Sequence, residues 1–316
     1  MSSLIQGGKM MSEIKLFSID GEVKEIKQTT FTLEKELQNI IEKNMQLFFG
    51  VTFLGSEYVI PNGRMDSIGI DENNCPVIFE YKRSVNENVI NQGLFYLDWL
   101  LDHKANFELL VLKKFGKEKA DAIDWSMPCV ICIANDFTKY DVHAVNQMQR
   151  NIKLVRYRRY GNELLLFEFL NDSQETALPI SSLSNSLSSE NSEINSTKNG
   201  AKTFSQRLEE APVNIKNIYF TIRDYILSLG DDVSENILRY YVAFRKVKNI
   251  VCVEVFKNKL ILHLRLDPDT VELKEGFIED ERNKGHWGTG DLEVIIKTPE
   301  DFERCKPLID RTYNEN

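Results

Sequence analysis

A polar, low-complexity segment divides the 316-residue chain and limits what each part can fold into. From Asn171 to about Ser205, the residues Ser, Asn, Glu and Thr replace the apolar residues that are frequent on both sides. Such a segment cannot bury enough apolar surface to offset the entropy of ordering it. We therefore expect a flexible linker over 171–205, which separates one domain at 12–170 from a second domain at 206–316. A linker this polar predicts no fixed interface between the two.

The first domain mixes helical and strand-like patterns, which predicts an α/β fold with one central mixed sheet flanked by helices. Helices are expected at 32–47, with Thr32 as the cap, and at 88–101, 117–123 and 142–148. Strands are expected at 58–60, 64–70, 77–82, 107–112, 129–134, 154–160 and 163–170. The second domain is expected to be small and α+β. Its helices are expected at 213–229, 235–244 and 299–313, and its strands at 250–256, 259–266 and 292–296.

The composition excludes several classes of protein. No apolar run is long enough to cross a membrane or to serve as a secretion signal, so we expect a cytoplasmic protein. Five scattered cysteines do not form a disulfide framework. Cys129 and Cys132 form a CxxC pair, but they lie in an apolar run that is typical of a buried strand. A net charge of −9 argues against a protein that coats nucleic acid non-specifically, although it does not exclude a nuclease.

Charged residues end one of the apolar strands. Because side chains alternate along a strand, Glu80 and Lys82 share one face of 77–82. If the preceding turn is centred on Asn73, Asp66 lies opposite Glu80, with Cβ atoms roughly 4.5–5.5 Å apart. Two carboxylates at this spacing repel each other unless a cation lies between them, and Mg²⁺ is the simplest candidate. The alternative is a surface ion pair between Glu80 and Lys82 on an edge strand.

Such a carboxylate pair suits phosphodiester hydrolysis. Mg²⁺ or Mn²⁺ would be held by Asp66, Glu80 and the backbone carbonyl of Tyr81, beside a scissile phosphate. The ion would polarise the phosphoryl group and activate a water molecule. Lys82, a compact and mobile charge, would orient that water and stabilise the charge that develops on the phosphate.

The order Asp66 followed by Glu80-Tyr81-Lys82 resembles the PD-(D/E)xK nuclease superfamily, whose fold is restriction-endonuclease-like. Met65 precedes the aspartate, where a proline gave the motif its name. Downstream, Gln92 to Tyr96 resembles the QxxxY motif of the RecB and lambda-exonuclease branch. The sequence around Asp66 and Glu80 is also similar to that of the mismatch-endonuclease group. The resemblance covers roughly residues 30 to 170.

The resemblance implies further site residues. Gln92 and Tyr96 would join the active site, because residues four apart share one helix face. The resemblance also calls for an acidic residue in the first helix. Glu36 is the first choice for this position, and Glu34 and Glu42 remain open. Ordinary helix-face packing is the alternative for Gln92 and Tyr96, and a solvated helix face is the alternative for Glu36.

Basic residues near this motif and on the 154–160 strand are candidates for contacting phosphates. They are Arg64, Arg83, Arg156, Arg158 and Arg159. Tyr157 and Tyr160 lie among them and could stack on bases, although a solvated strand face fits this cluster equally well. In the second domain, the glycine-rich loop at 284–291 lacks the strand-to-helix context of a phosphate loop, which argues against nucleotide binding there. This domain resembles an uncharacterised family found beside such nucleases.

The sequence therefore predicts a nuclease, a metal-dependent hydrolase acting on nucleic acid, with DNA in repair or defence as the favoured substrate. Every candidate catalytic residue precedes Asn171, so the first domain is expected to cleave by itself. The alternative is a binding module that recognises nucleic acid or protein without cleaving. The sequence does not decide whether the substrate is DNA or RNA, or whether cleavage is exo- or endonucleolytic. The oligomeric state also stays open, with a homodimer as one possibility.

Overall fold

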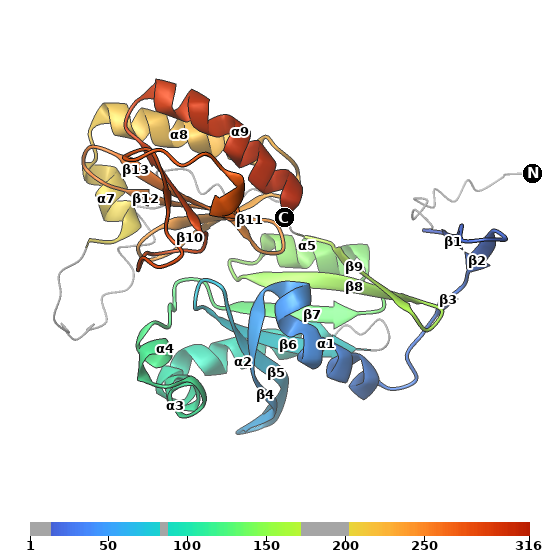
Figure 1. Cartoon of the computed structure of the whole chain (residues 1–316). Coiled ribbons are helices and arrows are strands. Elements are labelled where there is room, and N and C mark those ends of the chain that lie inside the picture. Colours follow the sequence, from blue (N-terminus) through green and yellow to red (C-terminus); the bar gives the residue numbers. More distant parts are fainter. Residues whose placement is uncertain (1–13, 83–87, 172–201) are drawn as a thin grey trace, which may run out of the picture.

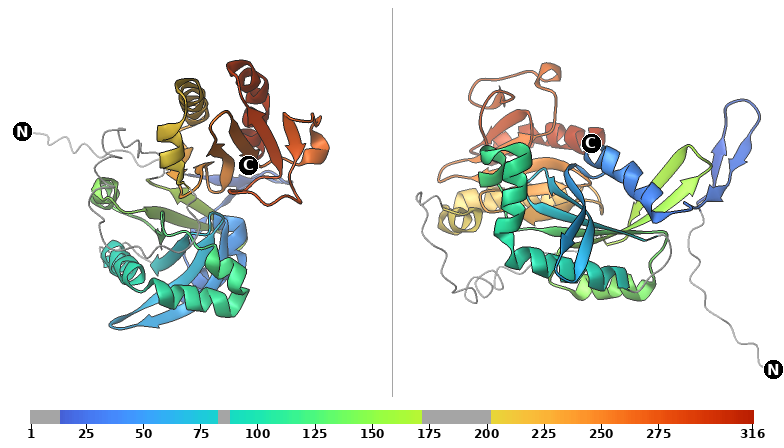
Figure 2. Two further views of the ribbon diagram at one scale, coloured as in Figure 1. Left: turned by 90° about the vertical axis from the view of Figure 1, so that its left-hand side faces the viewer. Right: turned by 90° about the horizontal axis from the view of Figure 1, so that it is seen from below.

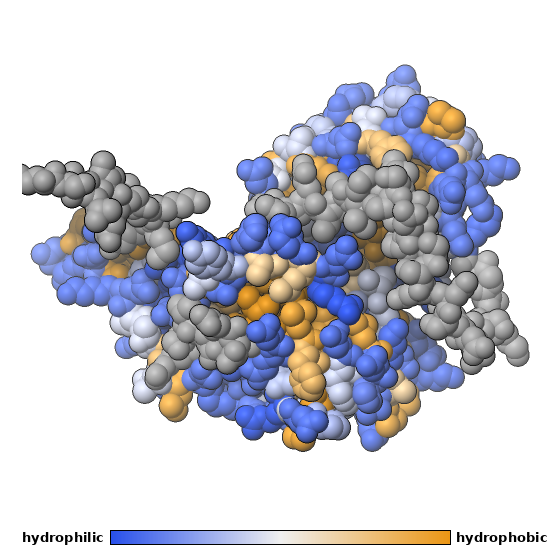
Figure 3. Space-filling view, turned by 180° about the vertical axis from the view of Figure 1, so that it is seen from behind, coloured by the Kyte–Doolittle hydropathy of each residue, from blue (hydrophilic) through white to orange (hydrophobic). Residues whose placement is uncertain are grey.

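The described residues fold around two large β-sheets, each covered by helices, and a third, two-stranded sheet lies beside them (Figure 1). The computed structural model describes residues 14–82, 88–171 and 202–316. Arg83 and most of the expected linker therefore lie outside the described residues. None of the described helices is long and apolar enough to cross a membrane. Hydrophilic residues cover most of the face shown in Figure 3, and hydrophobic ones gather near its middle.

The N-terminal sheet has seven strands in the order β3-β8-β7-β6-β5-β4, with β9 paired to β8. Strands β4, β5 and β6 form an antiparallel meander, whereas β6, β7 and β8 are parallel. The carboxyl ends of these three parallel strands therefore meet at one edge of the sheet. The strands are β3 (Gln28–Thr29), β4 (Val51–Ile60), β5 (Gly63–Asp71), β6 (Pro76–Lys82), β7 (Cys129–Ala134), β8 (Ile152–Tyr160) and β9 (Leu164–Phe169).

Helices cover both faces of this sheet because the side chains of its strands alternate between them. On β6, Phe79 and Tyr81 pack with residues of α1 (Glu34–Phe49), whereas Ile78 packs with residues of α2 (Asn88–Asp102). The remaining helices are α3 (Lys104–Phe115), α4 (Lys117–Asp121) and α5 (Lys139–Gln147). A separate hairpin of β1 (Leu16–Ser18) and β2 (Lys24–Ile26) lies near the end of the β8–β9 hairpin (Figure 2).

The C-terminal sheet has six strands in the order β10-β11-β12-β13-β15-β14. One face packs on α8 and α9, with Ile222 and Ile309 from the helices against Val253 and Leu262 from the sheet. The elements are α7 (Phe204–Glu210), α8 (Val213–Leu227), β10 (Ser234–Ile237), β11 (Val242–Arg245), β12 (Asn249–Val255), β13 (Leu260–Leu264), η1 (Pro268–Thr270), β14 (Ile278–Asp280), β15 (Leu292–Ile296) and α9 (Pro299–Glu315).

The β5–β6 turn of the first sheet is held by the second sheet. Asn73, which is 2% exposed, accepts hydrogen bonds through Oδ1 from Tyr241 Oη (3.0 Å) and Asn249 Nδ2 (2.6 Å). Glu72 accepts from Arg265 at 2.6 Å, and Asp71 forms a buried ion pair with Arg245. The expectation that the two domains share no fixed interface is therefore wrong. The polar residues of this turn suit a solvent-exposed hairpin, but here they form buried hydrogen bonds with residues about 170 positions later in the chain.

Three local expectations are also wrong. Residues 107–112, predicted as a strand, lie in α3, where Phe107 and Val111 are buried four positions apart on one helix face. Residues 235–244, predicted as a helix, form β10 and β11, whose Val242, Ala243 and Phe244 are buried consecutively as in an interior strand. Short apolar runs fit either structure. The first helix begins two residues after Thr32, with Leu33 as an N-cap that makes no side-chain hydrogen bond.

Candidate active site

The β5–β6 hairpin brings Asp66 and Glu80 together at the end of the meander. Its register pairs Ser67 with Phe79 and Ile68 with Ile78, and Asp66 and Glu80 are the next residues outward on the two strands. This register agrees with the turn centred on Asn73. β6 lies between β5 and β7, and Glu80 is 0% exposed. The alternative of a surface ion pair between Glu80 and Lys82 on an edge strand is therefore wrong, because β6 is an interior strand and Glu80 is buried.

The two carboxylates are fixed by the backbone of the opposite strand. Asp66 Oδ2 accepts a hydrogen bond from the Tyr81 backbone N–H at 3.0 Å, and Glu80 Oε1 accepts one from the Asp66 N–H at 3.3 Å. Glu80 Oε2 is buried and finds no hydrogen-bond partner among the described residues. A buried carboxylate oxygen without a partner is costly, so this atom requires a proton or a cation.

The electrostatics of the pair favour binding of a positive species. Burial, and after it the charge of Asp66, raise the pKa of Glu80 to about 9. Burial also raises the pKa of Asp66, against the hydrogen bond from Tyr81 and the charge of Lys82. At neutral pH the metal-free pair therefore holds a proton, because two buried carboxylates this close do not both ionise. A divalent cation would replace that proton.

Two cationic residues lie in one row of the sheet beside the pair. Lys82 pairs with Ala134 across β6 and β7, and Ala134 pairs with Arg156 across β7 and β8. Paired residues point to the same face, so Lys82 and Arg156 share the face of Glu80, about 10 Å apart along the row. Arg156 is bound to Asp136 at 2.7 Å and to Glu168 at 3.1 Å, with its side chain 13% exposed. These two ion pairs hold the guanidinium of Arg156 in place near the edge of the sheet where β6, β7 and β8 end.

The two residues of the QxxxY motif contact each other on α2. Gln92 Nε2 donates to Tyr96 Oη at 2.9 Å, and this hydroxyl also accepts from the Arg64 backbone N–H at 3.2 Å, two residues from Asp66. Tyr96 is buried, and its ring passes so close to Gly63 that a Cβ there would lie 2.6 Å from Cε1. The predicted shared helix face is present, and Tyr96 joins α2 to the start of β5.

The acidic residues of α1 have different environments. Glu36 accepts a hydrogen bond from the Thr32 N–H at the exposed start of the helix. Glu42 accepts from Ser67 Oγ at 2.6 Å, on the opposite face of the sheet from Asp66. Glu34 is close enough for its charge to raise the pKa of Asp66. Glu34 is therefore electrostatically coupled to the carboxylate pair, after Glu57 in the size of its effect on Asp66.

Gln38 is a site residue that the motifs do not reveal. It is 4% exposed, and its Nε2 donates to the Asp66 backbone carbonyl at 2.9 Å and to Glu42 at 2.8 Å. A polar residue beside Leu37 on the buried side of a helix is the signal that sequence reasoning had available. Gln38 positions the backbone that carries Asp66.

The other basic candidates are distributed unevenly. Arg64 is exposed on β5 and bonds Glu57 at 2.6 Å. Arg158 bonds Gln28, and the guanidinium of Arg159 lies 4.8 Å from the centre of the Phe31 ring. The expectation that the neighbouring tyrosines could stack on bases is wrong, because Tyr157 and Tyr160 are buried, with 1% and 2% of their surface exposed. Cys129 and Cys132 are buried on β7, as their apolar run predicted.

Comparisons with known proteins add a relative and a domain family. The chain is 30% identical to an uncharacterized protein of Haemophilus influenzae over 306 residues, which cover 96% of this chain and 100% of the relative. Residues 202–316 match the family described as Domain of unknown function (DUF5655). These descriptions state no activity.

Two solved structures are distantly similar. A repair endonuclease from Pyrococcus abyssi shares 18% identity and a TM-score of 0.28, over 42% of this chain and 51% of that chain. EndoMS in complex with double-stranded DNA shares 17% identity and a TM-score of 0.28, over 42% of this chain and 48% of that chain. The chain therefore spans about half of the length of each of these endonuclease chains.

Proposed function

We infer that this chain, which belongs to the same family as the uncharacterized Haemophilus influenzae protein, is a metal-dependent nuclease that hydrolyses phosphodiester bonds in DNA. One observation carries the proposal. Glu80 Oε2 is buried without a hydrogen-bond partner among the described residues, while Glu80 Oε1 accepts a hydrogen bond from the Asp66 N–H. The resemblance of residues 64–96 to the PD-(D/E)xK motifs supports the same assignment.

The donor set fits a hard divalent cation. Asp66 and Glu80 offer carboxylate oxygens, the ligand type that Mg²⁺ and Mn²⁺ prefer, and a backbone carbonyl such as that of Tyr81 would complete the protein's share. When bound, the ion would polarise the scissile phosphoryl group and lower the pKa of a bound water. The cation would also offset the burial and the repulsion from Asp66 that otherwise keep Glu80 protonated.

The remaining residues have distinct roles in the proposed reaction. Lys82 is half-buried at the end of β6, where its ammonium can hold the attacking water and stabilise the negative charge that develops on the phosphate. Arg156 lies in the same row, where a phosphate of the nucleic acid would bind its guanidinium by displacing Asp136 or Glu168. Gln92 and Tyr96 hold α2 against the strand that carries Asp66.

A cleavage assay tests this proposal. The purified chain is incubated with single-stranded and double-stranded DNA and RNA of the same sequence, with Mg²⁺, with Mn²⁺ or with a chelator. We expect metal-dependent cleavage of DNA, and none by the Glu80→Gln variant. If the wild-type protein binds Mn²⁺ and DNA yet cleaves no substrate, the nuclease proposal is contradicted and the alternative, a binding module, is supported. Equal cleavage by wild type and Glu80→Gln would remove Glu80 from the active site.

A further inference from the structure

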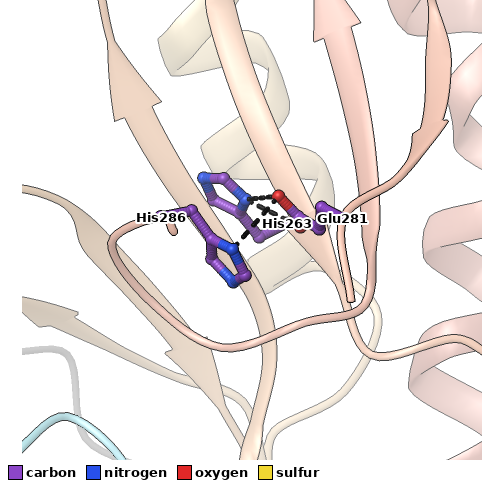
Figure 4. A group of neighbouring side chains, drawn as sticks. All are labelled: His263, Glu281 and His286. Carbon is purple, nitrogen blue, oxygen red and sulfur yellow. Dashed lines mark hydrogen bonds and ion pairs between the residues drawn. The ribbon is translucent and has the colours of Figure 1, made fainter. Parts of the chain in front are cut away.

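A second cluster of potential metal ligands lies in the C-terminal sheet, away from Asp66 and Glu80. His263 is on β13, Glu281 follows β14, and His286 lies in the loop before β15 (Figure 4). Their ligand atoms all lie within 4.8 Å of one another. Among the residues that the structure describes, no other group of three His, Cys, Asp or Glu side chains converges in this way.

The cluster is buried and its geometry is compact. His263 Nδ1 lies 2.9 Å from both oxygens of Glu281, and His286 Nδ1 lies 3.5 Å from Glu281 Oε2. The two imidazole rings stack with their centres 4.8 Å apart. The side chains of His263 and Glu281 are 1% and 0% exposed, whereas that of His286 is 19% exposed. One side of the cluster is therefore open to water.

A second carboxylate orients His263 from behind. Glu254 Oε1 lies 3.1 Å from His263 Nε2, the ring nitrogen that faces away from Glu281. With Nε2 donating its hydrogen to Glu254, Nδ1 can exchange the hydrogen that it donates to Glu281 for a metal ion. Metal-binding histidines are commonly held in this way, with the second ring nitrogen bonded to a carboxylate. Arg207, 3.7 Å from Glu254, balances that carboxylate's charge.

We propose that His263 Nδ1, Glu281 and His286 Nδ1 form a binding site for Zn²⁺, with Glu254 as the residue that orients His263. Zn²⁺ bonds histidine nitrogen and carboxylate oxygen at about 2.0–2.2 Å, so neighbouring ligands of a tetrahedral ion lie roughly 3.3–3.5 Å apart. The separations of 2.9 Å and 3.5 Å from Glu281 are close to this spacing. The ligand atoms of the two histidines, which lie within 4.8 Å of each other in stacked rings, would turn toward a common ion to reach it. Water takes the fourth position, on the open side beside His286.

The position of the cluster gives such an ion a structural consequence. The loop that carries His286 returns along the sheet, where Thr289 bonds Asn249 at 3.0 Å and Trp287 packs on Tyr240. Gly288 has a φ of 89°, and a Cβ there would lie 2.7 Å from that of Cys252, so the loop is tightly packed. Asn249 is also the residue that binds the turn of the carboxylate hairpin. Zn²⁺ would therefore fix a loop that borders the interface.

Zinc titration of the full-length chain tests the proposal. Asp66→Asn and Glu80→Gln are introduced together, so that binding reports only the C-terminal site and is independent of the proposed nuclease. Calorimetry of this metal-free protein is expected to give about one Zn²⁺ per chain, and thermal melting is expected to show stabilisation by the ion. Absence of saturable binding by the folded protein would overturn the site.

Variants separate a metal site from a buried cluster of ion pairs. His286→Ala changes the partly exposed ligand and is expected to fold, as circular dichroism would check, but to lose Zn²⁺ binding. Glu254→Gln should weaken binding by about 10–100-fold, because it removes the orienting carboxylate. His143→Ala, at an exposed histidine of α5, is the matched control and should bind like its parent. Unchanged affinity in folded His286→Ala would contradict the proposal.

Discussion

At the scale of single residues, Glu80 determines how the carboxylate pair behaves. Its neighbour Asp66 forms backbone hydrogen bonds and is half-buried, whereas Glu80 is fully buried and keeps one oxygen without a partner among the described residues. The same burial that raises the pKa of Glu80 to about 9 makes this oxygen receptive to a cation. In the proposed site, a proton and a metal ion would therefore compete for the same oxygen.

This competition predicts a pH-dependent stability in the presence of a chelator. The pKa of Glu80 is about 9 in the folded protein and ordinarily 4.5, so between these values the folded state binds a proton that the unfolded state lacks. The free energy of unfolding should therefore fall as pH rises from about 5 to about 9. Urea denaturation across this range should show a flatter curve for Glu80→Gln, which should be equally or more stable at pH 8. Parallel curves for the two proteins would contradict the assignment.

Lys82 is predicted to act on the rate of cleavage and not on metal affinity. Lys82→Ala should bind Mn²⁺ like wild type and lose about 100-fold or more in turnover, because in the proposed reaction the charge of Lys82 acts on water and phosphate and not on the metal. Lys82→Arg should not restore turnover, because a planar guanidinium does not replace a compact ammonium. Lys117→Ala, at an exposed lysine of α4, is the control. Near-normal turnover of Lys82→Ala would make Lys82 structural.

At the scale of elements, the hairpin of the site was predictable because its information is local. Alternation along 77–82 and the turn at Asn73 fix which residues face each other, and the observed register agrees. The strand-or-helix choice at 107–112 and 235–244 was not predictable, because partners distant in sequence decide it. Gln38 was missed for a similar reason, since its partner is a backbone carbonyl 28 residues away.

The contact between α2 and β5 yields a prediction at Gly63. A methyl group at this position would lie 2.6 Å from Tyr96 Cε1, so Gly63→Ala should displace Tyr96 from the Arg64 N–H and from Gln92. Stability should fall by about 1–3 kcal/mol, as for other overpacked sites, and metal-dependent turnover should fall with it. Gly55→Ala, whose added atom meets Ile68 at an ordinary 3.6 Å, is the control. Equal turnover and stability in both variants would contradict this role for Tyr96.

At the scale of the whole molecule, the two sheets are coupled through the turn between Asp66 and Glu80. Cys75 packs with Tyr241, Ala243 and Cys252 in one buried cluster, beside the hydrogen bonds of Asn73. The sequence could not reveal this interface, because nothing local distinguishes a buried Asn73 from an exposed turn residue. A fragment that ends near Leu170 would expose these groups to water. The structure therefore does not support the expectation that the first domain cleaves by itself.

Asn249 provides the test of this coupling. Its side chain bonds Asn73 at 2.6 Å and Thr289 at 3.0 Å while 0% exposed. Asn249→Ala leaves Asn73 with fewer partners and should lower the free energy of unfolding by about 1–3 kcal/mol. Asn214→Ala, at an exposed position of α8, should change it little. Urea denaturation followed by fluorescence and by circular dichroism measures the loss, and equal stability of the two variants would argue that the interface contributes nothing.

The central claim is that Asp66 and Glu80 together hold a divalent cation. Calorimetric titration with Mn²⁺ tests it most directly, in the full-length chain with His286→Ala so that the second cluster does not contribute. The expected result is saturable binding of about one ion per chain, lost in both Asp66→Asn and Glu80→Gln while the folded state persists. Unchanged Mn²⁺ affinity in both variants would contradict the claim.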